Sequence, residues 1–233
     1  LNNQLLKVFI LAGGLGTRLS GIVSDVPKPM APVENLPFLE YQIKLIEKSI
    51  SDYQLILLTQ YKSEIIEQYF KNKDKIETIK EDYPLGTGGS IKNAMKILNH
   101  EIDEPALILN GDSYIDVDYL SFTKECNNDI NILCTYQENC KRSSTLEIKN
   151  NIINKFNKQG FKEKNAYIST GCYYLKNTEL IQNYPEDQFM IENVFEDVCK
   201  FNKLHAYMFD GMFIDIGIPE DYFKFCEYIK NEH

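Results

Sequence analysis

The sequence predicts an α/β fold with a largely parallel sheet. Short apolar runs of the kind that form buried strands occur at residues 8–12, 54–59 and 106–110. Helical patterns separate or follow these runs, so strands and helices alternate along the first half of the chain. This alternation is typical of βαβ units, in which consecutive strands pair in parallel.

The first strand and the helix after it are clearly marked. Residues 8–12 form an apolar run that ends at Gly13-Gly14, which is typical of a buried strand entering a glycine loop. Pro37 suits the first turn of a helix predicted over residues 37–50. The apolar residues that recur on one face of this helix are Leu39, Ile43 and Ile46.

The remaining elements follow from the same patterns. After the strand at 54–59, the first half continues with a short amphipathic helix (62–70), a weaker strand (76–80), a loop (81–89), a helix (about 90–98) and a strong strand (106–110). The second half is richer in strands, which we expect at 130–136, 145–149, 152–156 and 167–175. Two further helices are expected at 191–201 and 219–230.

The composition is that of an acidic globular protein of 233 residues. Its formal net charge of −9 disfavours a nucleic-acid partner, because binding a phosphate backbone requires a basic surface. No run of 18 apolar residues occurs, so we expect no membrane span. The first residues lack the features of a signal peptide, and the six cysteines include no Cys-x-x-Cys pair. We therefore expect a cytoplasmic protein with reduced thiols.

A glycine loop follows the first strand, where residues 11–19 read LAGGLGTRL. Glycines remove side-chain bulk, so backbone N–H groups can approach phosphate oxygens. Arg18 lies within reach of the same anion, and its planar guanidinium can bond to phosphate oxygens in two directions. Taken alone, the loop is equally typical of a tight strand-to-helix turn with a surface arginine.

A proline-rich segment, VPKPMAPV, occupies residues 26–33. Its three prolines predict an extended loop, because proline fixes φ and does not fit a helix interior. Lys28 lies between Pro27 and Pro29, which restricts its backbone unusually for a lysine. Taken alone, the segment indicates a stiff connector with a solvated lysine.

Together, GGLGTRL and the Lys28-Pro29 pair resemble the sugar-1-phosphate nucleotidyltransferase family. The resemblance implies a Rossmann-like nucleotidyltransferase fold of three αβα layers with a mixed, mainly parallel sheet. It implies that Arg18 and Lys28 are catalytic and hold the triphosphate and the attacking phosphate. It also implies one domain, 1–233, with a nucleotide-binding half to about residue 120 and a sugar-phosphate-binding half over 121–233. The nucleotide-binding residues that it implies in the glycine loop are Leu11, Ala12, Gly13, Gly14, Gly16 and Thr17.

Three further motifs extend the resemblance over most of the chain. LGTGG, residues 85–89, resembles the family's base-contacting loop and adds Gly86 and Thr87 to the nucleotide site. LNGDS, residues 109–113, resembles the segment whose aspartate binds magnesium and nucleotide. FIDIGIPEDY, residues 213–222, resembles the motif that carries the second metal ligand. The implied Mg²⁺ ligands are therefore Asp112 and Asp215, and Asn110 and Gly111 are implied to contact the sugar.

The implied reaction requires residues of these types. An oxygen of the sugar phosphate attacks the α-phosphorus of an NTP in line with the departing pyrophosphate, so positioning and charge neutralisation carry the catalysis. Two carboxylates suit Mg²⁺, which prefers hard oxygen ligands. Arg18 and Lys28 would offset the negative charge that develops during transfer.

Within the family, the motifs look most like the guanylyltransferases that act on D-glycero-D-manno-heptose 1-phosphate. That resemblance implies GTP, a heptose acceptor and a product used in bacterial surface glycans. Glu81 adds a physical argument, because it precedes Gly86 where the family places a side chain against the base edge. A carboxylate only accepts hydrogen bonds, and guanine offers adjacent N1–H and N2–H donors. The alternative is an exposed acid beside Asp82.

The acceptor half departs from the heptose pattern. Residues 142–144 read Arg-Ser-Ser where those enzymes have Arg-Tyr-Gly, and residues 169–171 read Ser-Thr-Gly where they have Asn before a Gly pair. Their Phe-x-Glu-Lys motif has two placements here: residues 156–159 have the better spacing, and residues 161–164 have the right residues. The sugar-binding residues then expected are Glu163, Lys164, Thr170 and Gly171. Because polar partners select sugar hydroxyls, the sugar is left open, with mannose and glucose 1-phosphates as alternatives.

Other functions also stay open at this point. A relative could use UTP, dTTP or CTP, and a paralogue could bind a nucleotide sugar without catalysis. Asp116-Val117-Asp118 superficially resembles the metal-binding Asp-x-Asp of glycosyltransferases. We instead expect Asp116 to cap the next helix. The sequence leaves the oligomeric state open, a homo-oligomer included.

Overall fold

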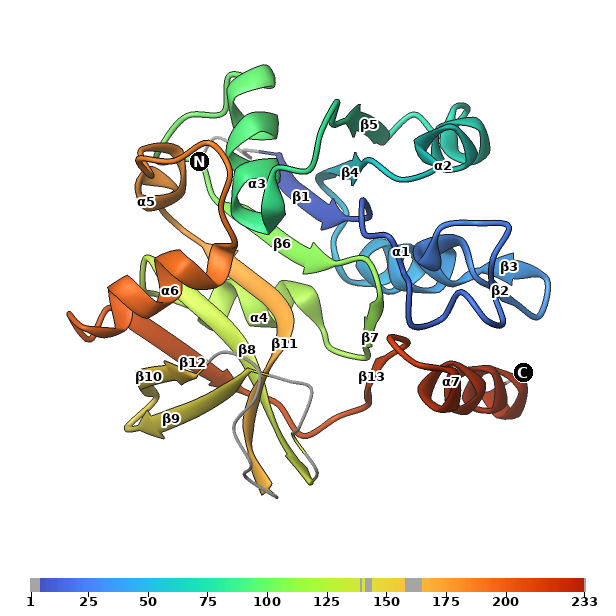
Figure 1. Cartoon of the computed structure of the whole chain (residues 1–233). Coiled ribbons are helices and arrows are strands. Elements are labelled where there is room, and N and C mark those ends of the chain that lie inside the picture. Colours follow the sequence, from blue (N-terminus) through green and yellow to red (C-terminus); the bar gives the residue numbers. More distant parts are fainter. Residues whose placement is uncertain (1–4, 139, 141–143, 158–164, 233) are drawn as a thin grey trace.

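A computed structural model describes residues 5–138, 140, 144–157 and 165–232 of the chain. Its centre is a nine-stranded mixed sheet (Figure 1). In spatial order the strands are β5 (Ile76–Lys80), β4 (Tyr53–Thr59), β1 (Leu6–Leu11), β6 (Ala106–Asn110), β11 (Asn165–Leu175), β8 (Ile130–Glu138), β12 (Leu204–Met208), β10 (Ile152–Asn157) and β9 (Thr145–Lys149).

The direction of pairing divides this sheet. Strands β5, β4, β1 and β6 pair in parallel, as the strand–helix alternation predicted. Strand β11 is antiparallel to both β6 and β8, and β12 is parallel to β8. The antiparallel β11 therefore joins the parallel half to the strand-rich second half.

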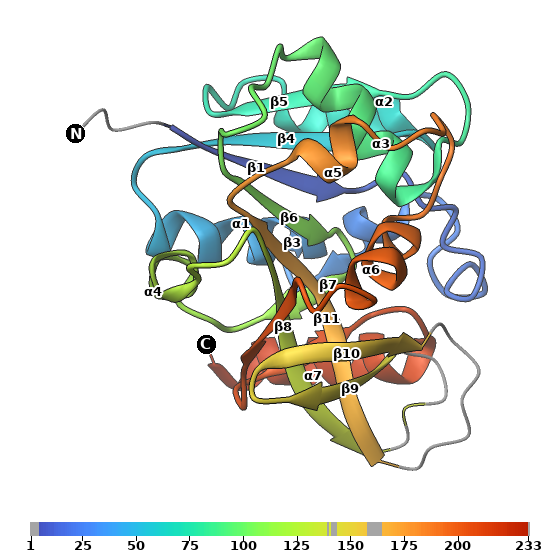
Figure 2. The ribbon, with the colours of Figure 1, turned by 90° about the vertical axis from the view of Figure 1, so that its left-hand side faces the viewer.

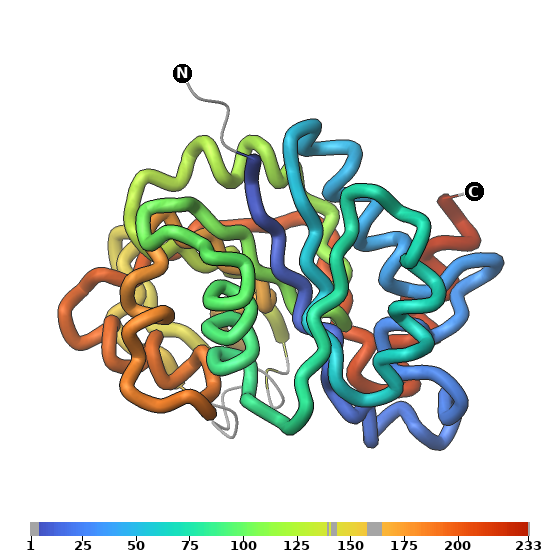
Figure 3. Tube along the Cα trace, turned by 90° about the horizontal axis from the view of Figure 1, so that it is seen from above, coloured from blue at the N-terminus to red at the C-terminus, as the bar shows by residue number. Residues whose placement is uncertain are grey.

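Helices cover both faces of the sheet, which gives the expected three layers. Figure 2 looks onto the face covered by α3 (Gly86–Ile97), α5 (Glu179–Gln182) and α6 (Ile191–Cys199). The opposite face carries α1 (Phe38–Ser49), α2 (Ser63–Phe70) and α4 (Tyr119–Glu125). Seen from above in Figure 3, β1 runs between α3 on one side and α1 and α2 on the other.

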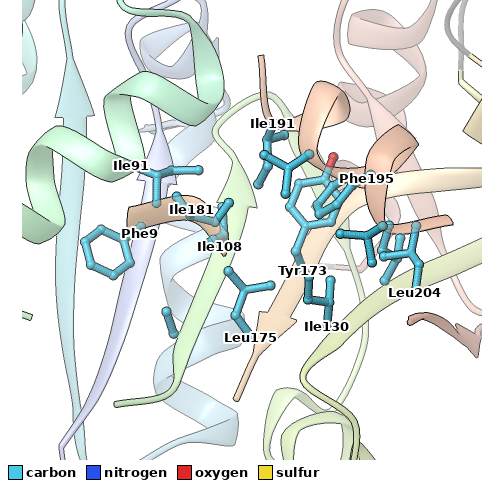
Figure 4. Close-up of a cluster of buried hydrophobic side chains, with 14 of the residues drawn as sticks. Phe9, Ile91, Ile108, Ile130, Tyr173, Leu175, Ile181, Ile191, Phe195 and Leu204 are labelled. Atoms are coloured by element: carbon cyan, nitrogen blue, oxygen red, sulfur yellow. The ribbon is translucent and has the colours of Figure 1, made fainter. Parts of the chain in front are cut away.

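Burial on both faces explains the continuous apolar runs of the central strands. Along β1, Phe9 packs into the core beneath α3, and Val8 and Ile10 pack into the core beneath α1. Figure 4 shows part of the first core, where Phe9, Ile108 and Leu175 lie near Ile91 of α3. These three central residues of β1 are thus buried whichever way their side chains point.

The remaining elements lie at one end of the sheet. They are the 3₁₀ turn η1 (Lys28–Met30), the strand pair β2 (Pro32–Val33) and β3 (Leu36–Pro37), the pair β7 (Ser113–Ile115) and β13 (Phe213–Asp215), and the last helix α7 (Pro219–Glu232). A third core joins them, in which Phe225 of α7 packs against Phe38 of α1 and Tyr114 of β7. No helix in the described ranges is both long enough and apolar enough to cross a bilayer.

Three local predictions are wrong. The segment around Lys28 is not extended throughout, because residues 28–30 form η1, in which Pro29 occupies the first turn. Helix α3 begins at Gly86 rather than near residue 90, so the LGTGG motif is mostly helix. The cap of α4 is Asp118 rather than Asp116, because the Asp118 side chain accepts hydrogen bonds from the backbone N–H groups of Leu120 and Ser121.

Helix α3 begins with glycines because another segment crosses it closely. A Cβ atom at Gly88 would lie 2.2 Å from Cε2 of Phe189, so only glycine fits without displacing the ring. The N–H groups of Gly88 and Gly89 donate to the Phe189 carbonyl at 3.0 and 3.1 Å. These amides are therefore engaged by the protein itself and do not point to a free anion.

We expect Gly88→Ala to lower the free energy of unfolding by about 1–2 kcal/mol. Overpacking costs about 1–3 kcal/mol, and the better helix propensity of alanine returns at most about 1 kcal/mol. The Phe189 ring is buried and stacks on the Tyr184 ring, with 4.2 Å between the ring centroids, which restricts its movement. Urea denaturation measures the loss. Gly21→Ala is the matched control, because its added Cβ would meet no atom within 4 Å; equal stability of the two variants would contradict the packing argument.

Candidate active site

The candidate site forms where the central strands β1 and β6 end. These strands are parallel neighbours, so the glycine loop after β1 and the Gly111-Asp112 turn after β6 emerge side by side. The Gly111 N–H donates to the Leu11 carbonyl at 3.0 Å, which fixes the two segments to each other. A Cβ at Gly111 would lie 2.7 Å from that carbonyl oxygen, so the close approach requires glycine.

The glycine loop also touches the proline segment. Gly16 has a φ of +60°, and a Cβ there would lie 3.0 Å from the Cβ of Lys28. Lys28 itself begins η1, which is closed by hydrogen bonds from Met30 N–H to Pro27 O and from Ala31 N–H to Lys28 O. The two motifs that the sequence singled out are therefore in contact at Lys28.

Lys28 and Asp112 form an ion pair between Nζ and Oδ2. The Lys28 side chain is only 11% exposed and that of Asp112 is 27% exposed, so the pair is largely shielded from solvent. The structure thus brings together a predicted catalytic lysine and a predicted metal ligand that are 84 residues apart in sequence.

Asp215 lies beside this pair. Strands β13 and β7 are antiparallel partners, with Asp215 opposite Ser113, and the Ile216 N–H donates to the Asp112 carbonyl at 2.9 Å. The Asp215 Oδ1 atom accepts a hydrogen bond from the Gly217 N–H at 2.8 Å. The carboxylate of the turn before β7 and the carboxylate at the end of β13 therefore belong to segments that are hydrogen-bonded to each other.

A pocket of about 350 Å³ opens next to these residues. Eight predicted residues line it: Leu11, Gly13, Gly14, Glu81, Gly86, Thr87, Asn110 and Asp112. The sequence did not single out the remaining lining residues, which are Leu15, Leu58, Gln60, Pro84, Ser90 and Met190. The pocket joins the glycine loop to the start of α3, as a nucleotide site spanning phosphate and base would require.

Glu81 is largely buried at one wall of this pocket. Its Oε2 atom accepts a hydrogen bond from the Leu85 N–H at 3.3 Å, and its own N–H donates to the Thr59 carbonyl at 2.8 Å. Within the described ranges Oε1 has no hydrogen-bond donor. The carboxylate is thus fixed in direction and retains accepting capacity, so the alternative of an exposed acid is wrong for Glu81.

Other predicted nucleotide-binding residues do not line the pocket. Ala12 is fully buried, and its N–H donates to the Leu58 carbonyl at 2.8 Å, so it supports the loop from beneath. Gly16 lies against Lys28, and Thr17 and Arg18 are exposed on the outer part of the loop. Arg18 forms no ion pair with any residue whose position is described.

A second pocket, of about 100 Å³, also has Asn110 in its wall. Asn110, Thr170, Gly171 and Asp215 line it, as predicted for the sugar side or the metal. Gly171 has a φ of +78°, and a Cβ there would lie 2.3 Å from Nδ2 of Asn110, so the glycine makes room for that amide. The Thr170 hydroxyl donates to the Leu133 carbonyl at 2.9 Å and is fixed by it.

The rest of the second pocket is polar and was only partly foreseen. Residue 156, from one of the two placements of the Phe-x-Glu-Lys motif, lines it, whereas Glu163 and Lys164 lie outside the described residues. Burial, with the nearby Glu192 carboxylate, raises the pKa of Tyr173, so this phenol stays a neutral hydroxyl. The lining residues not predicted are Ser113, Ser144, Ser169, Tyr173, Glu192 and Phe213.

One contact links the two pockets. The Thr87 hydroxyl oxygen accepts a hydrogen bond from the Ile191 N–H at 2.9 Å and lies 3.5 Å from Oε2 of Glu192. Thr87 lines the first pocket and Glu192 lines the second. Sequence reasoning could not find this wall, because residues 189–192 carry no motif of their own and reach the site only through tertiary packing.

The chain is similar to known proteins over nearly its whole length. Residues 7–232 match the family described as nucleotidyl transferase. The chain is 37% identical over 224 residues to D-glycero-alpha-D-manno-heptose 1-phosphate guanylyltransferase of Campylobacter jejuni, covering 94% of this chain and 98% of that protein. It is 34% identical over 230 residues to the enzyme of the same name from Aneurinibacillus thermoaerophilus, covering 94% and 96%.

A solved structure is similar over the same length. The crystal structure of HddC from Yersinia pseudotuberculosis complexed with GMP-PN superimposes with a TM-score of 0.82 and 34% identity, covering 97% of this chain and 100% of that chain. The resemblance stated from the motifs, the fold and the enzyme class are confirmed by these comparisons. The chain belongs to the nucleotidyl transferase family.

Proposed function

We propose that this chain transfers GMP from GTP to D-glycero-α-D-manno-heptose 1-phosphate and releases pyrophosphate. One observation carries the proposal: Asp112, which is paired with Lys28, lines a nucleotide-sized pocket, and Asn110 lines both this pocket and a small polar pocket that Asp215 also lines. Two substrates bound in these pockets would meet at Asn110, next to the turn that carries Asp112. The names of the similar proteins, which include a guanylyltransferase and a GMP-PN complex, support the choice of substrates.

The chemistry places few covalent demands on the protein. A phosphate oxygen of the acceptor forms a bond to the α-phosphorus of GTP while the bond to the bridging oxygen of pyrophosphate breaks. Lys28 is held by its ion pair with Asp112, from where its ammonium can offset charge on the reacting phosphates. Arg18, exposed on the glycine loop, is free to approach the triphosphate from outside. The roles assigned to these two residues are part of the proposal.

The residues present fit a divalent cation, which we propose is Mg²⁺. Asp112, in the turn before β7, and Asp215, at the end of β13, supply hard oxygen donors from paired segments. Within the described ranges there is no cluster of three or more His, Cys, Asp or Glu side chains suited to a metal. A two-carboxylate site suits Mg²⁺, which usually keeps water and phosphate oxygens as its other ligands. When bound, the ion would neutralise charge on the phosphates.

We also propose that Glu81 selects guanine. Its carboxylate lines the larger pocket, is oriented by the Leu85 N–H, and can accept hydrogen bonds from adjacent N–H donors. Adenine has one amino donor on its Watson–Crick edge beside an acceptor nitrogen, which a carboxylate would repel. The division of the chain near residue 120 into nucleotide and acceptor halves and the cytoplasmic location stay predictions.

Glu81→Gln is expected to lower the preference for GTP over the other three NTPs by about tenfold or more, because one charge-assisted acceptor becomes a donor. The measurement is kcat/KM for pyrophosphate release with each NTP. Asp82→Asn is the matched control, because Asp82 is the exposed neighbour and does not line the larger pocket. Unchanged discrimination in Glu81→Gln would remove the guanine argument.

The experiment that tests the proposed function is a substrate panel. Each of the four NTPs is assayed with heptose, mannose, glucose and fucose 1-phosphates, with pyrophosphate and the nucleotide sugar both quantified. We expect the highest kcat/KM for GTP with the heptose phosphate and equal yields of the two products. Pyrophosphate release with no acceptor at all, or none with any pair, would refute the transfer reaction.

A further inference from the structure

Gln42 of α1 lies beneath the turn that carries Asp112. This turn, Gly111-Asp112, connects β6 to β7, and the carbonyl groups on either side of it face Gln42. The Nε2 group of Gln42 donates to Asn110 O at 2.8 Å and to Ser113 O at 3.0 Å. One amide group therefore bridges the residue before the turn and the residue after it.

The chemistry of the partners fixes the orientation of this amide. Both partners are carbonyl oxygens, so the NH₂ end has to face the turn. Gln42 is fully buried, and its Oε1 atom has no hydrogen-bond partner in the described part of the chain. A buried acceptor without a donor costs free energy, which an apolar side chain of the same length would avoid. The two hydrogen bonds that Nε2 donates therefore explain why a glutamine occupies this buried position.

The backbone of the turn is also held by two hydrogen bonds to other backbone groups. Gly111 N–H donates to Leu11 O, and the Asp112 carbonyl accepts from Ile216 N–H. These bonds tie the turn to β1 and to the segment after β13. Gln42 adds the support of α1, whose buried face is packed against the sheet by Leu39, Ile43 and Ile46.

We propose that Gln42 is a positioning residue that acts through Asp112, an inference that rests on the proposed function. Its amide holds the turn so that the Asp112 carboxylate meets Lys28 and lies beside Asp215. Without the donor, the Asn110 and Ser113 carbonyls would turn toward other donors and move the carboxylate. A displacement of about 1 Å at a reacting site can cost about 100-fold in rate.

Two variants test the proposal. Gln42→Met keeps the length and removes the donor, and Gln42→Glu keeps the shape but places carboxylate oxygens against two carbonyls. Both are expected to lower kcat by about 10- to 100-fold and to raise the Mg²⁺ concentration needed for half-maximal activity. Calorimetry is expected to show wild-type GTP affinity without Mg²⁺ and a smaller gain in affinity on adding Mg²⁺.

The control separates positioning from stability. Ile46→Ala removes packing from the same buried face of α1 without a bond to the turn, so it should lower the unfolding temperature and leave the Mg²⁺ dependence unchanged. Gln42 variants that lose stability but keep wild-type kcat and Mg²⁺ dependence would overturn the proposal. If the Met and Glu variants do not fold, Gln42→Asn, which keeps the amide but is too short to bridge both carbonyls, must show the same altered Mg²⁺ dependence.

The failure of the proposed function would look different. A wild-type protein that releases no pyrophosphate with any substrate pair refutes the transfer reaction. The calorimetric comparison of GTP binding with and without Mg²⁺ still decides the role of Gln42 in that case, because it requires no turnover.

Discussion

Replacing Asp112 with asparagine is expected to lower kcat by about 100- to 1000-fold while the protein stays folded. The substitution keeps the size of the side chain and removes its charge. Asparagine cannot form the ion pair with Lys28 and is a weaker ligand for a divalent cation than a carboxylate. Pyrophosphate release at saturating Mg²⁺ measures the loss, and circular dichroism with thermal unfolding establishes the fold.

Asp116→Asn is the matched control for this experiment. Asp116 is exposed and belongs to the Asp-x-Asp sequence that would bind metal in a glycosyltransferase. If the chain is a nucleotidyltransferase with the site described above, Asp116→Asn keeps wild-type turnover. Near-native turnover of Asp112→Asn with Mg²⁺ would show that the metal assignment is wrong, and loss of turnover in Asp116→Asn would favour the other motif.

Arg18→Ala is expected to lower kcat/KM by a similar factor, about 100- to 1000-fold, but with almost no change in stability. Arg18 is exposed and forms no ion pair in the part of the chain that is described, so its truncation should change the free energy of unfolding by no more than about 0.5 kcal/mol. A large kinetic effect without a stability effect would identify an interaction made only with substrate.

Arg18→Lys refines this prediction, because it keeps the charge and loses the planar fork. We expect its kcat/KM between those of wild type and Arg18→Ala. Lys224→Ala, which removes an exposed charge from α7, is the control for a general effect of net charge. If Arg18→Ala retained wild-type kcat/KM, the glycine loop would be a structural turn with a surface arginine.

The sequence predicted the parts of the fold that local patterns determine. The strands β1, β4 and β6 are apolar runs because both faces of the sheet are covered, and α1 and α7 begin at or next to a proline. The LGTGG segment was misread as a loop because glycine disfavours helices locally. Its conformation is set by the crossing of Phe189, which lies about 100 residues away in sequence and which no local pattern reveals.

The residues of the candidate site were likewise predicted where they belong to a motif and missed where they do not. Gly13, Lys28 and Asp112 were found because each belongs to a motif with a chemical reason, and the structure brings Lys28 and Asp112 into contact. Gln42 and Glu192 were missed because each is a polar residue on a helix pattern with no motif around it. Their positions follow from how α1 and α6 pack, which composition and periodicity do not specify.

The Lys28–Asp112 pair has a consequence for how the nucleotide and the divalent cation bind. Each charge of this pair already has a partner within the protein, so the pair exerts little net attraction on a lone ion. An anion that bound Lys28 alone would leave the Asp112 carboxylate without its partner. A cation that bound Asp112 alone would leave the Lys28 ammonium without its partner. When the nucleotide and the divalent cation bind together, both Lys28 and Asp112 have a partner of opposite charge. Each ligand should therefore strengthen the binding of the other, and by the same factor, as thermodynamic reciprocity requires.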